Sequence, residues 1–225
     1  MKNVLNPALF THREGTTEGF NNLCTIIHQL RDEGIYSGEI QRGKNLIGNF
    51  TLCFDKKFPT HEVHIDAAKF DPLFNKESCG QSGEQTFEVG GQGYLVLYTS
   101  GSHADLRVKL YRRDEKKVER SYDTANLSTG DMVVFRLARS GSYRVQHTTE
   151  KHGMTLAVRS AGERKYPSGL GKFPPINVKL TPRGFDPAQV EQWPFQALII
   201  QIEIPGALRL ELRDEKAASK KAKRR

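Results

Sequence analysis

Along most of the chain, hydrophobic and polar residues alternate in short runs that Gly, Ser, Asp and Asn separate. This alternation predicts β-strands, because successive side chains of a strand point to opposite faces of its sheet. So many short strands with turn residues between them predict a mainly β protein, an antiparallel β-sandwich. The runs predict strands at residues 47–55, 62–67, 85–90, 93–100, 106–111, 118–123, 131–138, 142–147, 154–160, 176–180, 195–204 and 207–213.

Two segments depart from this alternating pattern. The hydrophobic residues Phe20, Leu23, Ile27 and Leu30 recur at helical spacing, and they predict one N-terminal helix at about residues 16–33. The run FDPAQVEQW predicts a helical turn or a compact loop, because its Asp-Pro dipeptide is typical of a helix start.

The predicted elements divide the chain into three parts. Residues 1–46 form an N-terminal segment that holds the helix, residues 47–213 form the β-sandwich domain, and residues 214–225 form a basic tail. No internal repeat is visible in the sequence.

Positive charge is concentrated in the tail. The formal net charge of the whole chain is +8, and residues 213–225 hold seven Lys or Arg against two Asp or Glu. Such a segment cannot bury enough apolar surface to fold alone, so it predicts either a free solubilising extension or an arm that binds nucleic acid or another acidic partner. The residues expected to make this contact are Lys216, Lys220, Lys221, Lys223, Arg224 and Arg225.

Other features of the sequence favour a cytoplasmic protein. Cys24, Cys53 and Cys79 are widely spaced and form no CxxC pair, so free thiols in a reducing compartment are expected. No apolar run is long enough for a transmembrane helix. The first residues also lack the continuous apolar stretch of a secretory signal.

Residues 127–158, LSTGDMVVFRLARSGSYRVQHTTEKHGMTLAV, contain two turns of a known kind. Gly130-Asp131 leads into one predicted strand, and the turn Gly141-x-Tyr143 begins the next. The run resembles the closing strands of a cupredoxin domain. This resemblance implies a cupredoxin-like sandwich; an immunoglobulin-like sandwich is the alternative that the strand pattern leaves open.

The resemblance also implies where metal ligands would lie. His147 stands where the family has its copper-ligating cysteine, and His152 and Met154 occupy the family's ligand loop. A blue-copper site needs a thiolate, and no cysteine follows Cys79, so an electron-transfer site is not expected. The two histidines and Met154, with His103 or His64 as a further ligand, could hold copper, zinc or nickel. The scattered spacing of the histidines favours the alternative, a structural loop without a cofactor.

No catalytic motif stands out in the sequence, which disfavours an enzyme. A nucleophile elbow and a Walker lysine are both missing. The HEVH run at residues 61–64 places its two histidines on opposite faces of a strand, where they cannot bind one ion. The hairpin of residues 107–120 interleaves Tyr111 with basic residues, as single-strand binding requires, but Glu115 and Glu119 dilute its charge.

Three functions are consistent with these observations. The favoured one is a non-catalytic β-sandwich module that binds protein partners or assembles with itself, with the basic tail as an anchor. One alternative is a cupredoxin-related protein that binds metal through His147 and His152. The other is a nucleic-acid-associated protein that acts through its tail.

Overall fold

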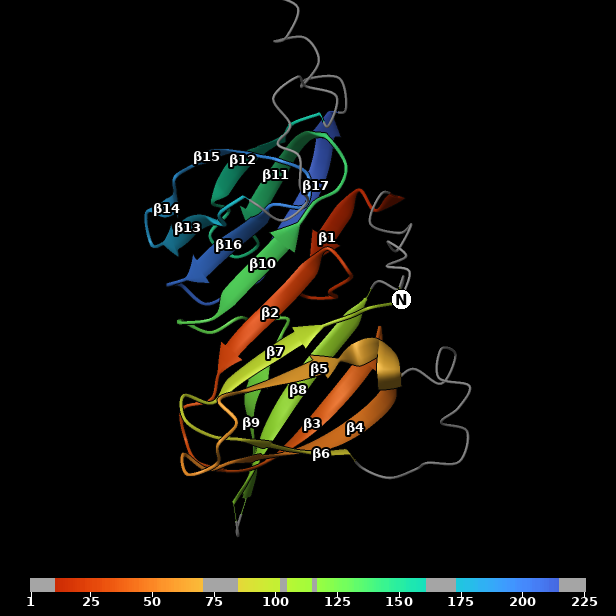
Figure 1. Cartoon of the computed structure of the whole chain (residues 1–225), viewed down its shortest axis with the longest axis vertical. Helices are drawn as coiled ribbons and strands as arrows, with labels where there is room; N and C mark the ends of the chain where they lie inside the picture. The colour runs from red at the N-terminus through yellow and green to blue at the C-terminus, as the bar shows by residue number, and fades with distance from the viewer. Residues whose placement is uncertain (1–10, 71–84, 102–104, 115–116, 161–172, 215–225) are drawn as a thin grey trace, which may run out of the picture.

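The alternating runs fold into strands that pair into three sheets, as the computed structural model in Figure 1 shows. The structure describes residues 11–70, 85–101, 105–114, 117–160 and 173–214. The central sheet has seven strands in the order β14 (Gly184–Asp186), β13 (Ile176–Thr181), β16 (Ala197–Ile202), β10 (Met132–Arg136), β2 (Cys24–Gln29), β7 (Tyr94–Tyr98) and β5 (Glu62–Asp66).

Two five-stranded sheets complete the fold. The N-terminal sheet has the order β6 (Gln85–Val89), β4 (Asn45–Phe54), β3 (Gly34–Arg42), β8 (Leu106–Asp114) and β9 (Lys117–Asp123). The C-terminal sheet has the order β1 (Glu14–Thr16), β17 (Leu208–Asp214), β11 (Gly141–His147), β12 (Gly153–Val158) and β15 (Gln189–Gln192). A short 3-10 helix, η1 (Ala67–Phe70), follows β5.

The predicted antiparallel sandwich, cupredoxin-like or immunoglobulin-like, is wrong. The three sheets are mixed, and they follow one another along the long axis of the molecule in a solenoid-like arrangement (Figure 1). Parallel pairs join β4 to β6, β5 to β7, β12 to β15 and β13 to β16. Alternation along one strand cannot reveal these pairs, because parallel and antiparallel strands share the same period of two.

The predicted N-terminal helix is also wrong. The parts of the chain that the structure describes contain no α-helix, and the centre of the predicted helix is β2. Cys24, Ile26 and His28 face the core, while the residues between them face outward. The β-branched run Thr25-Ile26-Ile27 favours a strand, and pairing with β7 and β10 on both sides fixes it. The FDPAQVEQW run likewise forms β14 and β15 rather than a helical turn.

The two halves of the chain repeat one strand topology, so the expectation of no internal repeat is wrong. The order β6-β4-β3-β8-β9 corresponds to β15-β12-β11-β17-β1, and β5-β7-β2 corresponds to β13-β16-β10, with the same parallel and antiparallel pairs. Residues 14–40 therefore align with residues 121–147 without a gap. We call residues 11–114 the N-terminal half and residues 117–214 the C-terminal half.

Hydrogen bonds repeat at the aligned positions. The N–H of Thr17 donates to Leu208 O at 3.0 Å, and the Leu208 N–H donates to Thr17 Oγ1 at 3.0 Å. Thr124 makes the same two bonds with Val108, at 3.0 and 3.1 Å. These bonds join the two halves. The first strand of each half pairs with the last strand of the other half: β1 with β17, and β9 with β8.

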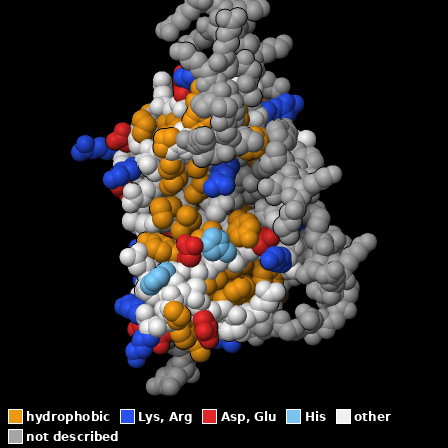
Figure 2. Space-filling view, viewed as in Figure 1, with side chains coloured by type: hydrophobic (Ala, Val, Ile, Leu, Met, Phe, Trp, Pro, Cys, Tyr) orange, Lys and Arg blue, Asp and Glu red, His pale blue; other side chains and the backbone are white. Residues whose placement is uncertain are grey.

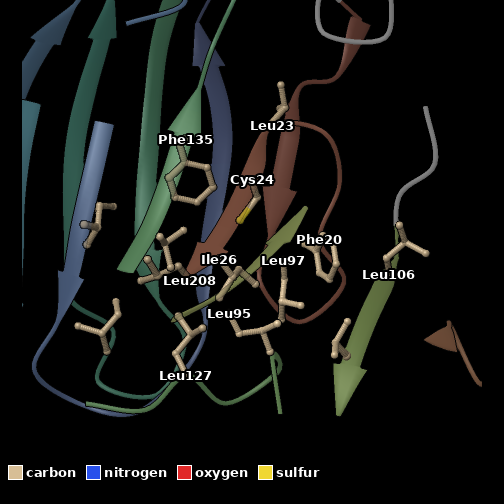
Figure 3. Packing of buried hydrophobic residues seen from close by; sticks show 14 of the residues in the cluster. Phe20, Leu23, Cys24, Ile26, Leu95, Leu97, Leu106, Leu127, Phe135 and Leu208 are labelled. Atoms are coloured by element: carbon tan, nitrogen blue, oxygen red, sulfur yellow. The ribbon is translucent and has the colours of Figure 1, made fainter. Parts of the chain in front are cut away.

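One hydrophobic core runs through both halves. It includes residues that are almost fully buried on all three sheets, such as Phe50 on β4, Ile26 on β2 and Leu210 on β17. Figure 3 shows Phe20, Leu97 and Leu106 of the N-terminal half in the same cluster as Phe135 and Leu208 of the C-terminal half. The antiparallel pair β2–β10, in the middle of the central sheet, joins the halves and lies on the pseudo-two-fold axis that relates them.

Candidate functional site

The histidine at the end of β11 is a buried structural group. His147 is 1% exposed; its Nε2–H donates to Pro205 O at 3.1 Å, and its Nδ1 accepts the Glu150 N–H at 3.2 Å. Burial lowers the pKa of this imidazole, which favours its neutral form. A Cβ on Gly206 would lie 2.0 Å from Nε2, so the backbone closes over the ring. With both nitrogens engaged, His147 offers no lone pair to a metal ion.

The other candidate metal ligands do not gather around His147. His152 is on the same hairpin, and its Nε2 donates to Pro182 O at 3.2 Å. Met154 is buried on β12 opposite Val145 and is part of the hydrophobic core. His103 lies outside the described residues. Within the described ranges, no three His, Cys, Asp or Glu side chains are close enough together to hold a metal ion.

The candidate nucleic-acid residues divide into a tail and a hairpin. The tail contacts expected at Lys216, Lys220, Lys221, Lys223, Arg224 and Arg225 lie outside the described residues. The hairpin is β8–β9, and part of its charge is paired within the fold. Arg107 donates to both oxygens of Asp123 at 2.7 and 2.6 Å, and Tyr111 donates to Glu39 at 3.3 Å. Arg120 lies against the same Asp123 at 3.4 Å, so two arginines of the hairpin share one carboxylate.

Three residues of the HEVH run lie in β5, which begins at Glu62, after His61. Glu62 and His64 share the exposed face of β5, with His64 Nε2 3.1 Å from Glu62 Oε1. Asp66 follows them but is buried, and it accepts hydrogen bonds from the N–H and hydroxyl of Ser100. These contacts tie the end of β5 to the end of β7.

A buried polar cluster that sequence reasoning missed lies where the two halves meet. His28 Nδ1 is 2.7 Å from Asp131 Oδ1, and the second Asp131 oxygen accepts the Ser128 N–H at 2.7 Å. The ring of Tyr122 stacks on His28 at 3.8 Å between centroids. Burial, and then the charge of Asp131, raise the pKa of Tyr122 well above its ordinary value. The available signal was His28 itself, a polar residue at a core position of the alternation Cys24-x-Ile26-x-His28.

A second missed feature is the outward face of the central sheet. The inward side chains of its middle strands are buried. Several of the alternating outward side chains are also apolar, although Val96 among them is buried and polar residues such as Thr25 and Arg136 share this face. We call this surface the open face. It consists of Ile27 on β2, Tyr94, Val96 and Tyr98 on β7, Met132 and Val134 on β10, and Ala197 and Ile199 on β16.

Strand register places the open-face residues side by side. Met132 lies opposite Ile27, which lies opposite Val96, and Val134 lies opposite Ile199. Figure 2 shows hydrophobic side chains running down the middle of the molecule over the strands that Figure 1 presents to the viewer. The sequence signal was the adjacent hydrophobics in TII, VVF and LII, since strands with two apolar faces are covered on both faces.

Comparison with known proteins assigns no relationship: no family model, no curated protein and no solved structure matches the chain. Within its described part, the chain has no helix long and apolar enough to cross a bilayer.

Proposed function

We propose that the chain is a non-catalytic binding and assembly module that docks a protein partner onto its open face. The observation that carries this proposal is the partly exposed apolar patch formed by Ile27, Met132, Val134 and Ile199 across three adjacent strands. Contiguous apolar patches are rare on the free surface of soluble proteins, and they mark sites of association.

The chemistry of the open face fits a protein partner. The patch offers aliphatic and aromatic groups, including Tyr94 and Tyr98, whose rings supply contact area and whose hydroxyls supply polar contacts. Exposed polar residues, Gln29 and Gln201, lie at its margins. An apolar centre with a polar rim is the usual anatomy of a protein–protein interface.

The proposed place of action is the cytoplasm. Cys24 and Cys53 are free thiols, and Cys24 is buried in the core, where burial strongly raises its pKa and keeps it unreactive. Free thiols of this kind suit a reducing compartment.

A site-specific photo-crosslinker tests whether protein covers the open face. The probe replaces Gln201, an exposed residue beside Met132 on the open face, and a matched probe replaces Thr155, an exposed residue on the C-terminal sheet. Irradiation of the cells that make the protein is expected to give a protein adduct from position 201 and not from position 155. The substitution Ile27→Lys should remove that adduct. Equal adducts from both positions, or none from position 201, would contradict the proposal.

A further inference from the structure

We infer that this chain forms a dimer by exchanging its halves, in which the N-terminal half of each copy pairs with the C-terminal half of the other. The inference concerns the contacts between the halves, and it does not depend on what docks on the open face. Three observations support it: the strand pairs that join the halves, the sequence of the connection between them, and the charges that the exchange brings together.

The strand pairs between the halves can form within one chain or between two. In the described part of the chain, three antiparallel pairs join the halves: β1 with β17, β2 with β10, and β8 with β9. Because each pair takes one strand from each half, a second copy can supply all of the partners at once. The exchanged dimer keeps these strand pairs, so the connection between the halves decides between the two forms.

The connection between the halves lacks the residues that tight turns favour. Asp114 on β8 lies opposite Lys117 on β9, so only Glu115 and Lys116 separate the two strands in the sequence. Two-residue hairpin connections favour Asn-Gly, Asp-Gly or another pair with glycine, because their central residues adopt positive φ. Glu and Lys rarely adopt this backbone conformation. The sequence of this connection therefore disfavours closure of the hairpin within one chain.

Two other hairpins with connections of the same length do have a glycine. β3 and β4 are joined through Gly43 and Lys44, and Gly43 has a φ of +58°. β13 and β14 are joined through Pro182 and Arg183, and the next residue, Gly184, has a φ of +117°. Each of these hairpins lies within one half. Of the three hairpins, the one without a glycine is therefore the one that links the halves.

Exchange brings opposite charges together at the centre of the dimer. When the hairpin opens, β8 continues into β9 as one strand, and this strand pairs with its copy about a two-fold axis. The register that places Asp114 opposite Lys117 then continues through the centre of the ribbon. It places Glu115 of each copy opposite Lys116 of the other, and opposite charges at such cross-strand positions are favourable. The connection therefore suits a ladder between two copies.

A disulfide between the halves distinguishes exchange from side-by-side association. Thr16 on β1 lies opposite Arg209 on β17, so Thr16→Cys with Arg209→Cys places two thiols within reach of each other. The purified full chain is refolded from urea at rising concentration, oxidised and separated by size. The expected dimer has twice the mass of the 25.4 kDa chain, and its chains should stay joined on a denaturing gel without reductant. Thr16→Cys alone is the control and should leave the chains separate.

The sequence of the connection provides a second test. Glu115→Asn with Lys116→Gly installs a favourable hairpin turn and should lower the amount of dimer at equilibrium by at least about tenfold. Lys44→Gly changes the hairpin within the N-terminal half; it is the matched control and should leave the amount of dimer unchanged. Circular dichroism and thermal melting establish that each variant is folded.

Three results would overturn the inference. They are a chain that stays monomeric at every concentration, a dimer whose chains separate on the gel although the paired thiols are oxidised, and an amount of dimer that the Asn-Gly turn leaves unchanged. None of these results bears on docking at the open face, which the photo-crosslinker at position 201 tests independently.

Discussion

At equivalent positions of β3 and β11, the N-terminal half has Gly38 and the C-terminal half has Val145. Their cross-strand neighbours differ in size in the opposite sense. Gly38, the smaller of the two residues, lies opposite Phe50, the larger of the two neighbours, whereas Val145 lies opposite Met154. A Cβ on Gly38 would lie 2.1 Å from the Phe50 ring, so the ring occupies the space that a side chain at position 38 would need. The halves thus conserve the volume of a core layer while changing which strand supplies it.

The junction between the halves shows a second difference. Position 28 corresponds to position 135, and position 24 corresponds to position 131. One of the two equivalent pairs is apolar, Cys24 opposite Phe135, and the other is the buried polar pair His28–Asp131. The fold tolerates either chemistry, provided that each polar group finds its partner.

Two devices are common to both halves. Each half has a Gly-x-Tyr turn in which the tyrosine hydroxyl donates to the carbonyl oxygen four residues earlier: Tyr36 to Asp32 at 2.5 Å, and Tyr143 to Arg139 at 2.9 Å. The glycines that precede these tyrosines have φ of +149° and +154°, which side chains rarely adopt. The two halves therefore share backbone geometry at these turns, whereas the side chains that meet at equivalent core positions differ.

The largest expected effect follows from exchanging the core layer. Gly38→Val forces a side chain into the Phe50 ring and should destabilise the protein by about 3 kcal/mol. Gly38→Val with Phe50→Met reproduces the layer of the C-terminal half and should recover most of that loss. Urea unfolding of the two variants and the wild type measures both values. A double variant no more stable than the single one would show that the two layers are not interchangeable.

Removing one member of the buried pair His28–Asp131 should lower the free energy of unfolding slightly less than Gly38→Val does. Asp131→Ala leaves His28 and the Ser128 N–H buried without their acceptor, for a loss of about 2 kcal/mol in the free energy of unfolding. His28→Phe with Asp131→Cys installs the chemistry of the equivalent pair and should recover more than half of the loss. Chemical denaturation of the variants tests this, and a double variant as unstable as Asp131→Ala would contradict the equivalence.

Substitution of the two turn glycines, Gly34 and Gly141, should destabilise the protein by similar amounts. Gly34→Val and Gly141→Val each place a side chain at a strained φ and should each cost about 1 kcal/mol or more. Melting curves of the two variants provide the measurement. If one glycine proved indifferent while the other did not, the turns would not be equivalent.

The smallest effect concerns pH. The pKa of His147 lies below its ordinary value of 6.5 in the fold, so the unfolded chain takes up a proton first. Well above pH 6.5, the protonation of His147 therefore does not affect the free energy of unfolding. As the pH falls through that value, proton uptake by the unfolded chain lowers the free energy of unfolding by less than about 1 kcal/mol per pH unit. His147→Ile introduces the residue type of the equivalent Ile40. This substitution should reduce the change of the urea unfolding midpoint between pH 7 and 5, whereas His152→Gln should not.

How much of this molecule the sequence could predict depends on the range of the interactions. Strands such as β4, β7 and β10 follow from alternation that is local to each run. The pairing of β1 with β17 joins segments at opposite ends of the chain, and no local pattern specifies it. The helix predicted around Ile27 fails for the same reason, because pairing on both sides of β2 overrides local spacing.

The candidate sites show the same limit. His147 and His152 are on one hairpin, but the Pro205 carbonyl that engages His147 comes from a distant segment. The repeat is faint in the sequence because few identical residues remain; Thr17, Leu30, Gly34 and Tyr36 are identical to their counterparts in the stretch that aligns without a gap. The pattern of buried positions, which only the fold reveals, carries the rest of the correspondence.

The exchange of first strands has a consequence for how the protein is made. During synthesis, β8 leaves the ribosome before β9, the strand that covers its edge, and β1 must wait for β17, the last described strand of the chain. A nascent N-terminal half therefore exposes an unpaired strand edge, the kind of surface that invites aggregation. Neither half can close its own sheet, so the chain is expected to reach its final form in one late step rather than half by half.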